Sequence, residues 1–337
     1  MIRWAILGTG FISNTVAAAI QASAGSQAHV VAGRNPDAVA KFQRQYDIPH
    51  HSVGYDAALA DPAVDAVYIG LPNNVHHSLT IQAAAQGKAV LSEKSLTTTM
   101  DQAQELVASV QAHQTFFVEG LMYLAHPLYR RLQEVLLDGR LGQLRGVQGF
   151  YAADIWQVTN PAGRGTLYNL GCYPVSLLQF VVQTMCGPHA FASHRLSGLG
   201  NVSARDGTIV DASVTARFDT GVLATLQSTD SYGMAHGFTI SGDKGVLRFV
   251  TNPWLPVAGR NHIQWCPYGG EVEDIFVETG KDSFAHQIEM VETCLATGQL
   301  EAQRPSPRLQ DSLEVMAFLT EWEAQCLASE AGDTGGG

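Results

Sequence analysis

A glycine-rich segment near the start of the chain has the residue types that bind a dinucleotide. Gly8–Ser13 (GTGFIS) directly follows the apolar run Ile2–Leu7 and opens a helical stretch. The first glycine allows a tight turn, and the second lets the main chain approach a pyrophosphate, which then meets helix N–H groups. A plain strand-to-helix turn is the alternative, but the order of strand, turn and helix favours a cofactor site. We assign to it Gly8, Thr9, Gly10, Phe11 and Ile12.

The end of the second predicted strand bears on which dinucleotide binds. NAD sites usually place Asp or Glu there, where the carboxylate bonds the ribose hydroxyls. In this chain Gly33 and Arg34 stand at that place, and the first acidic residue after the strand is Asp37. Arg34 can pair with a 2′-phosphate through its planar fork, although a solvated loop charge is the simpler interpretation. We therefore predict NADP(H) as the cofactor, with NAD as the alternative.

Two further segments follow predicted parallel strands, at the end of the sheet where α/β proteins bind ligands. One runs from Gly70 to His76, and the other is Glu93-Lys94. A lysine at such a place can hold positive charge beside a reacting oxygen and lower the barrier to oxyanion formation. An isolated lysine after a strand is more often a surface charge. From these segments we add to the cofactor site Leu71, Pro72, Asn73, His76, Glu93 and Lys94.

The elements that must position these residues alternate in type over the first 120 residues. Short apolar runs alternate with helical stretches, and Thr99–Gln102 fits a capping box before one of the helices. Continuous apolar strands separated by helices predict a parallel, doubly wound sheet. We expect a dinucleotide-binding Rossmann domain over residues 1–120.

After about residue 120 the pattern changes to longer, alternating strands. Consecutive strands with few helical crossovers predict an α+β domain with an open, mainly antiparallel sheet over residues 121–328. Ser241–Gly245 reads as a hairpin turn. Ser306 and Pro307 have the residue types of an N-cap and first position, which predicts a last helix from there. We expect residues 329–337 to be a disordered tail.

Composition excludes several classes of protein. The chain has 337 residues, 46% hydrophobic and 15% charged, so it is long and apolar enough for large folded cores. Its net charge of −11 argues against general nucleic-acid or anionic-membrane binding. Stretches of 18 apolar residues do not occur, so we expect no membrane span. Five cysteines without a Cys-x-x-Cys pair suggest reduced thiols in the cytoplasm, and we expect no metal site.

Taken together, these segments resemble the Gfo/Idh/MocA oxidoreductase family over residues 2–328. Its glycine-rich turn, Pro-Asn segment before His and Glu-Lys-Pro motif are matched by Gly8–Ser13, Pro72–His76 and Glu93-Lys94. The chain is most similar to the branch of dihydrodiol and NADP-dependent D-xylose dehydrogenases. The Asp-x-Gly-x-Tyr motif of that branch corresponds to Asn169–Tyr173. The resemblance implies a Rossmann domain joined to a domain with an open antiparallel sheet.

The resemblance also implies a mechanism. Tyr173 would be the general acid/base at the reacting oxygen, with Lys94 beside it. A nearby ammonium favours the tyrosinate form and so makes proton transfer practical nearer neutral pH. Hydride would pass between the nicotinamide and a substrate carbon. The implied enzyme is an NADP(H)-dependent dehydrogenase or reductase that acts on the CH–OH group of a sugar, polyol or cyclic trans-diol.

The chain departs from the family pattern at several positions. Ser95 replaces the family proline, and Asn169 replaces the motif aspartate, which removes a carboxylate that could bind a substrate hydroxyl. Met122 stands where the dihydrodiol enzymes have a tryptophan, and Leu124 where the branch often has an arginine. Aromatic rings beside polar groups suit a sugar ring or cyclic diol. The candidate substrate residues are Met122, Tyr123, Tyr151 (or its neighbour Phe150), Trp156, Asn169 and Phe284.

A second interpretation is a non-catalytic NADP-binding regulator on the same scaffold, because the family includes regulators. The presence of both Lys94 and Tyr173 argues against it. We also expect a homo-oligomer, a dimer or tetramer, that covers the open sheet of the second domain, because a large apolar sheet face is costly in water.

Overall fold

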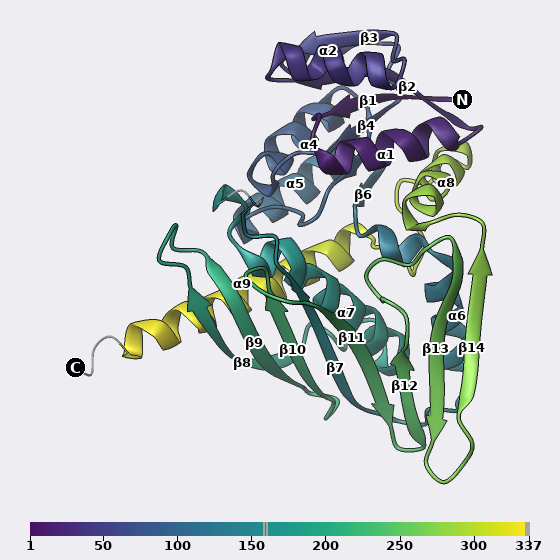
Figure 1. Ribbon diagram of the computed structural model, residues 1–337, viewed down its shortest axis with the longest axis vertical. Coiled ribbons are helices and arrows are strands. Elements are labelled where there is room, and N and C mark those ends of the chain that lie inside the picture. The colour runs from purple at the N-terminus through teal and green to yellow at the C-terminus, as the bar shows by residue number, and fades with distance from the viewer. Residues whose placement is uncertain (158, 160, 334–337) are drawn as a thin grey trace. The chain divides into compact units, whose positions relative to one another are not determined.

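The computed structural model describes residues 1–157, 159 and 161–333, and the chain divides into two compact units (Figure 1). The first comprises residues 1–125 and 281–310, and the second residues 126–280 and the chain from 311 onward. Residues 281–310 thus pack with the first unit although they lie far along the chain. Ile288 and Val291 from that later segment join the same buried core as Trp4.

The first unit is a doubly wound parallel sheet, as predicted. Its six strands lie in the order β3-β2-β1-β4-β5-β6, and every neighbouring pair is parallel. The strands are β1 (Ile2–Leu7), β2 (Ser26–Gly33), β3 (His50–Val53), β4 (Ala66–Ile69), β5 (Ala89–Ser92) and β6 (Phe117–Glu119). Strand order reverses at the β1–β4 pair, so the turns after β1 and β4 flank the switch point at which open α/β sheets bind ligands.

Six helices and two short helical turns connect and cover this sheet. They are α1 (Phe11–Ala22), α2 (Pro36–Gln45), α3 (Asp56–Ala60), η1 (Asn73–Val75), α4 (His76–Ala85), α5 (Met100–His113), η2 (Met122–Ala125) and α8 (Ser283–Ala296). The predicted cap of α5 is present, since the Thr99 hydroxyl accepts a hydrogen bond from the Gln102 N–H at 3.3 Å. Helix α1 begins at Phe11, directly after the glycine turn.

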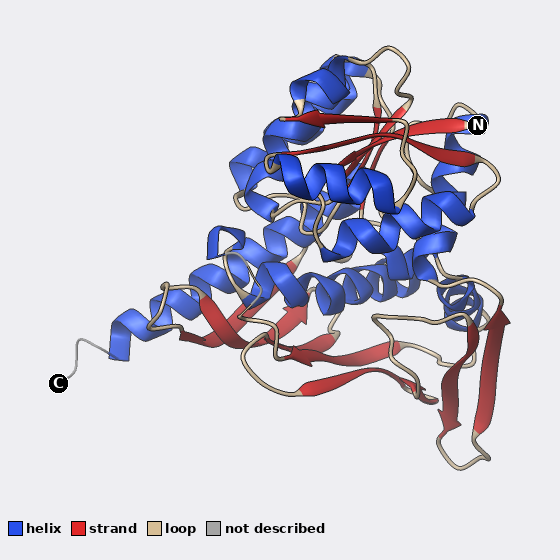
Figure 2. Cartoon of the chain, turned by 45° about the horizontal axis from the view of Figure 1, so that its top comes forward, coloured by secondary structure: helices blue, strands red, loops and turns tan. Residues whose placement is uncertain are grey.

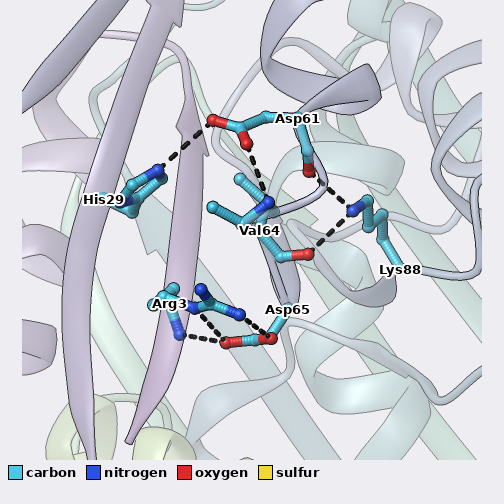
Figure 3. Close-up of polar contacts among 7 residues, drawn as sticks. Arg3, His29, Asp61, Val64, Asp65 and Lys88 are labelled. Atoms are coloured by element: carbon cyan, nitrogen blue, oxygen red, sulfur yellow. Dashed lines mark hydrogen bonds and ion pairs between the residues drawn. The ribbon is translucent and has the colours of Figure 1, made fainter.

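Charged side chains close the end of this sheet opposite the glycine turn (Figure 3). The Arg3 guanidinium forms two hydrogen bonds of 2.9 Å with Asp65, and this contact holds the pKa of the Asp65 carboxyl below its usual range. The Lys88 ammonium donates to the main-chain carbonyls of Asp61 and Val64 at 2.7 and 2.8 Å. These contacts tie the starts of β1, β4 and β5 together, at the end of the sheet away from the carboxyl ends of its strands.

The second unit is built on an eight-stranded sheet in the order β14-β13-β12-β11-β7-β10-β9-β8 (Figure 1). Only the β7–β10 pair is parallel, so the prediction of a mainly antiparallel sheet is confirmed. The strands are β7 (Leu144–Ala153), β8 (His194–Val202), β9 (Ile209–Phe218), β10 (Leu223–Thr229), β11 (Met234–Gly242), β12 (Gly245–Phe249), β13 (Gly259–Pro267) and β14 (Glu273–Thr279).

Helices of the second unit pack on one face of this sheet (Figure 2). The helical elements of this unit are α6 (Pro127–Leu137), η3 (Pro161–Gly163), η4 (Leu167–Gly171), α7 (Cys172–Cys186) and α9 (Leu309–Asp333). The turn η4 is π-helical and leads directly into α7. Along β9 and β10, buried residues alternate with exposed ones, so the other face of the sheet is open within this unit.

Two expectations about the C-terminal region were wrong in detail. The last helix begins at Leu309 and not at Ser306, because Ser306 donates its N–H to the Gln303 carbonyl in a turn that precedes the helix. Residues 329–333, expected to be disordered, continue α9, and residues 334–337 lie outside the described part of the chain. Among the described residues, no helix is both long and apolar enough to cross a membrane.

Candidate functional site

The glycine turn after β1 packs directly against the segment after β4. Gly8 has a φ of +109°, and a Cβ added there would lie 2.5 Å from the Gly70 carbonyl oxygen. Ser13 is fully buried, and its hydroxyl donates to the same carbonyl at 3.3 Å. Gly8 therefore has to be a glycine, and Ser13 fills the third position of the motif with a small side chain that still permits close packing.

The N-terminus of α1 fits a dinucleotide pyrophosphate. Gly10 is the N-cap residue, and no side chain of the described residues caps the helix there. Gly10 is exposed, and no described atom lies within 4 Å of the position that a Cβ would take. Thr9 and Ile12 are half-buried, and Phe11 is 87% exposed. Uncapped N–H groups, the positive end of the helix dipole and open space beside a glycine are features that favour the binding of a phosphate anion.

The loop after β2 presents a cation with no ion-pair partner among the described residues. Gly33 ends the strand and is buried against Val39. Arg34 is exposed. Asn35 caps α2, since its side-chain oxygen accepts from the N–H groups of Asp37 and Ala38 at 3.0 Å. Asn35 is thus engaged with the start of α2, whereas the charged side chain of Arg34 remains exposed in this loop.

His76 links the two loops that follow β4 and β5. Its ring is fully buried, with Nε2 2.7 Å from the Leu71 carbonyl oxygen and Nδ1 2.8 Å from the Ser95 carbonyl oxygen. Burial lowers the pKa of His76, whereas the two carbonyl contacts act in the opposite direction. Because both partners are hydrogen-bond acceptors, His76 fixes the loop that carries Lys94 against the loop that carries Asn73. His76 is a predicted cofactor residue, and its ring nitrogens are directed at the protein main chain.

Glu93 and Lys94 extend from the end of β5. Glu93 is buried, and its Oε1 accepts a hydrogen bond from the Tyr68 hydroxyl at 2.9 Å. Burial raises the pKa of the Glu93 carboxyl, while the adjacent Lys94 ammonium opposes that shift. The Lys94–Ser95 peptide bond is cis, and Lys94 itself is half-buried. A buried acid next to the lysine thus forms part of the surroundings of the ammonium.

The predicted acid/base Tyr173 lies in the second unit, in the first turn of α7. It is 7% exposed and belongs to an aromatic cluster with Tyr151 and Trp254. Its ring meets Tyr151 edge-on at a centroid distance of 5.3 Å and lies 6.2 Å from Trp254. Trp254 is fully buried and donates its indole N–H to the Phe150 carbonyl at 3.1 Å. Burial raises the pKa of Tyr151 to about 12, so the Tyr151 hydroxyl stays protonated and can donate to a ligand.

Two more predicted substrate residues lie in the same unit. Asn169 is half-buried in η4, four residues before Tyr173, and its Nδ2 donates to Asp230 Oδ2 at 3.2 Å. Trp156 is half-buried, and the Arg205 guanidinium lies 5.0 Å over its ring. Asn169, Tyr151 and Tyr173 therefore belong to one region of the second unit. The Trp156 ring instead has the Arg205 guanidinium over one of its faces.

The other three candidate substrate residues belong to the first unit. Met122 and Tyr123 lie in η2 and are 3% and 0% exposed. Phe284 is partly buried in α8 and packs on the core around Trp4. Within this unit Phe284 therefore has the surroundings of a packing residue.

Sequence reasoning missed three residues at these sites. The Tyr68 contact with Glu93 joins neighbouring strands, and nothing in the spacing of these residues indicates it. Trp254 lies far from Tyr151 and Tyr173 in the sequence, and only the fold brings the three rings together. Asp230 gave no signal beyond its place at the end of a strand. Among the described residues, no group of three or more His, Cys, Asp or Glu side chains converges as metal ligands.

Comparison with known families now decides the identity of the scaffold. Residues 2–120 match the profile described as "Oxidoreductase family, NAD-binding Rossmann fold", and residues 129–248 match the GFO/IDH/MocA C-terminal domain. The chain belongs to the Gfo/Idh/MocA oxidoreductase family. The matched N-terminal range contains the glycine turn, Arg34, His76 and Lys94, and the C-terminal range contains Tyr173 and Asp230.

Individual members of the family resemble the chain over nearly its whole length. Human trans-1,2-dihydrobenzene-1,2-diol dehydrogenase is 26% identical over 331 residues, which cover 95% of each protein. The Xenopus tropicalis enzyme is 25% identical over 329 residues, covering 95% of this chain and 96% of its own. The 3-ketoreductase KijD10 from Actinomadura kijaniata, solved with NADP and TDP-benzene, has the same fold. Its TM-score is 0.85 at 22% identity, with 96% of this chain and 97% of that chain covered.

Proposed function

We propose that the protein is an NADP(H)-dependent oxidoreductase that transfers hydride between nicotinamide and a sugar, a polyol or a cyclic trans-diol. The observation that carries the proposal is the uncapped N-terminus of α1, open at Gly10 and next to the loops held together by His76. Such a site takes a phosphate anion at the switch point of the sheet. The dihydrodiol dehydrogenase relatives support the CH–OH chemistry.

The first unit offers a series of groups to a dinucleotide. The main-chain N–H groups from Gly10 to Ile12 would hold the pyrophosphate, and exposed Arg34 would pair with a 2′-phosphate. A 2′-phosphate adds an anion at the place where NAD has a neutral hydroxyl, so Arg34 favours NADP and leaves NAD as the weaker ligand. The solved KijD10 complex with NADP supports this choice. When bound, the cofactor supplies the hydride donor or acceptor.

Proton transfer falls to Tyr173, with Lys94 as its electrostatic partner. The tyrosine hydroxyl would give a proton to the oxygen of a carbonyl substrate, or accept one from an alcohol. The Lys94 ammonium would stabilise negative charge on that oxygen and on the phenolate. Both residues occupy positions that match family motifs, and the buried side chain of Glu93 belongs to the residue next to Lys94.

The substrate class follows from the chemistry around Tyr173. Tyr151 and Trp254 provide apolar ring faces, and Asn169 provides an amide that can both donate and accept. Sugar rings and cyclic diols have apolar faces and hydroxyl edges that suit such a set. Two solved relatives support it, aldose-aldose oxidoreductase from Caulobacter crescentus with glycerol, and levoglucosan dehydrogenase with NADH and levoglucosan.

The open face of the second sheet supports assembly into a homo-oligomer. Exposed apolar residues on its strands include Phe150, Leu223 and Phe276, which are 40%, 52% and 47% exposed. Burial of such a face against a second copy removes apolar surface from water. Sedimentation velocity should then show a dimer or tetramer, and Leu223→Asp should shift it toward monomer. All five cysteines are free, which fits the reducing cytoplasm as the compartment.

A substrate screen tests the proposal directly. The protein is titrated with NADPH by fluorescence and then assayed with NADP⁺ at alkaline pH against aldoses, inositols, levoglucosan and trans-dihydrodiols, while reduced cofactor is followed by absorbance. We expect tight NADPH binding and turnover of at least one compound. Binding without turnover of any of them would instead support the regulator, and no binding of either dinucleotide would refute the proposal.

A further inference from the structure

Asp230 is a buried acid next to the site around Tyr173. It directly follows β10, is 1% exposed, and its main chain is bonded on both sides. The Asp230 N–H donates to Val210, while its carbonyl accepts from Ile155 and Trp156 at 2.9 and 2.8 Å. Asp230 forms no ion pair with any described residue, and its Oδ1 has no hydrogen-bond partner among them. Burial of a carboxyl group with one oxygen unpaired costs free energy. A buried acid of this kind therefore points to a specific role for Asp230.

The contact of Asp230 with Asn169 connects this acid to the site. Segment 166–171 is fastened to β10 at two points. The Thr166 hydroxyl lies 2.7 Å from the Ser228 hydroxyl, and Asn169 Nδ2 lies 3.2 Å from Asp230 Oδ2. From Asn169 the chain continues without a break through η4 into α7 and reaches Tyr173 four residues later. Asp230 therefore lies directly behind the amide that precedes the proposed acid/base.

The hydrogen-bonding chemistry of the two groups determines which branch of the Asn169 amide faces Asp230. An ionised carboxylate only accepts hydrogen bonds, so it must meet the –NH₂ branch of Asn169 and not the oxygen branch. The amide is planar, and its oxygen is then turned away from Asp230. The carboxylate therefore favours the orientation in which the carbonyl oxygen of Asn169 points away from Asp230.

We propose that Asp230 is a positioning residue that orients the Asn169 amide, so that Asn169 offers its carbonyl oxygen to a hydroxyl group of a polyhydroxy substrate. This inference rests on the proposed function. It assigns to Asp230 and Asn169 together the recognition of a hydroxyl, which the aspartate of the family motif could provide by itself. Since Asp230 has almost no exposure, it acts through Asn169 and not by contact with substrate.

Protonation of Asp230 should reverse this preference. Burial, helped by the carboxylates of Asp211 on β9 and Asp206 in the β8–β9 loop, raises the pKa of Asp230 to about 6 against the opposing hydrogen bond from Asn169. A protonated Asp230 carries an O–H that can donate to the oxygen of a flipped Asn169 amide. Asn169 would then present its –NH₂ branch, which suits a carbonyl compound and not an alcohol. The affinity for an alcohol should therefore fall as the pH drops through about 6.

Two substitutions at Asp230 separate orientation from ionisation. The best alcohol from the screen is the probe, and KM and kcat are measured with saturating NADP⁺ from about pH 5 to about pH 9. Asp230→Leu removes every acceptor, and we expect KM at about pH 8 to rise about tenfold with kcat within about threefold. Asp230→Asn keeps an acceptor but cannot ionise. It should keep KM within about threefold of wild type and lose the rise in KM below about pH 6.

The controls decide whether Asn169 transmits the effect. Asp211→Asn removes a charge from the neighbouring strand without touching Asn169, and should leave KM at about pH 8 unchanged while it moves the midpoint to lower pH. In Asn169→Leu, KM should be raised and lack the inflection near pH 6, and Asp230→Leu should then add no further effect.

Several results would overturn the inference while the proposed function stands. They are an unchanged KM in Asp230→Leu, an inflection that persists in Asp230→Asn or Asn169→Leu, and additive effects in the double variant. If Asp230→Leu does not fold, the dependence of KM on pH in Asn169→Leu decides whether the inference holds. An inflection near pH 6 that persists in this variant would overturn it. A wild-type protein that turns over no compound would refute the proposed function itself, and this inference with it.

Discussion

Replacement of Gly10 by alanine should weaken dinucleotide binding and leave the fold intact. Gly10 has φ −78° and ψ −175°, a conformation open to alanine, and no described atom lies within 4 Å of the added Cβ. In the free protein the methyl group therefore meets only solvent. Lower entropy of the unfolded chain and the weaker N-cap preference of alanine nearly cancel, so we expect the free energy of unfolding to stay within about 1 kcal/mol of wild type.

The same methyl group would occupy the space through which a pyrophosphate approaches the helix. Displacement of the phosphate from even one N–H donor removes a charge-assisted hydrogen bond of about 1.5–3 kcal/mol. The Kd for NADPH should thus rise by about tenfold to a hundredfold. Fluorescence titration with NADPH and urea unfolding of the same preparation provide both quantities. Wild-type affinity in Gly10→Ala would refute the placement of the cofactor at this turn.

Gly8→Ala is the matched control, because it should act through the fold. Gly8 has φ +109°, and its Cβ would lie 2.5 Å from the Gly70 oxygen. Left-handed strain of about 1–2 kcal/mol and overpacking of about 1–3 kcal/mol predict a loss of about 2–5 kcal/mol in unfolding free energy. The two glycines of one motif should therefore differ, one in binding and the other in stability.

Further variants test the cofactor choice, the buried acid and the surroundings of Lys94. Arg34→Ala should raise the Kd for NADPH about tenfold and leave that for NADH unchanged, and equal effects on both would contradict a 2′-phosphate contact. Folded Asp230 binds its proton more tightly than the unfolded chain, so its contribution to stability falls as pH rises from about 4 to about 6. The unfolding free energy of Asp230→Asn relative to wild type should then increase by about 3 kcal/mol over that range in urea titrations, and a flat difference would refute the raised pKa. Tyr68→Phe deprives buried Glu93 of a hydrogen bond and should cost about 1–3 kcal/mol of unfolding free energy, and wild-type stability would contradict this.

Local patterns predicted the first unit well, because its signals are short in sequence. The glycine turn, the apolar strands and the Thr99 cap each involve residues within a few positions of one another. The strand β8 has a weak sequence pattern, because Gly198 and Gly200 interrupt it. In the fold, both glycines face α9, where a Cβ would meet Trp322 or Cys326 at 2.9 Å. That requirement arises from packing with a helix more than a hundred residues later.

The candidate site shows the same limit. Position in the chain suggested Lys94 and Arg34, because both follow strands of a recognisable parallel pattern. The partners that shape the site are distant in sequence, such as Ser95 for His76 and Asp230 for Asn169. His76 illustrates the difference, since its position beside the site was predicted, whereas its two carbonyl contacts required the folded chain.

The rate of hydride transfer in a single turnover tests the central claim most directly. Lys94→Met and Tyr173→Phe are each saturated with NADPH and mixed rapidly with the carbonyl form of the best substrate, and oxidation of the cofactor is followed by fluorescence. We predict that each variant binds NADPH within about threefold of wild type and transfers hydride at least about a hundredfold more slowly. A wild-type rate in either variant would contradict the roles assigned to the lysine and the tyrosine.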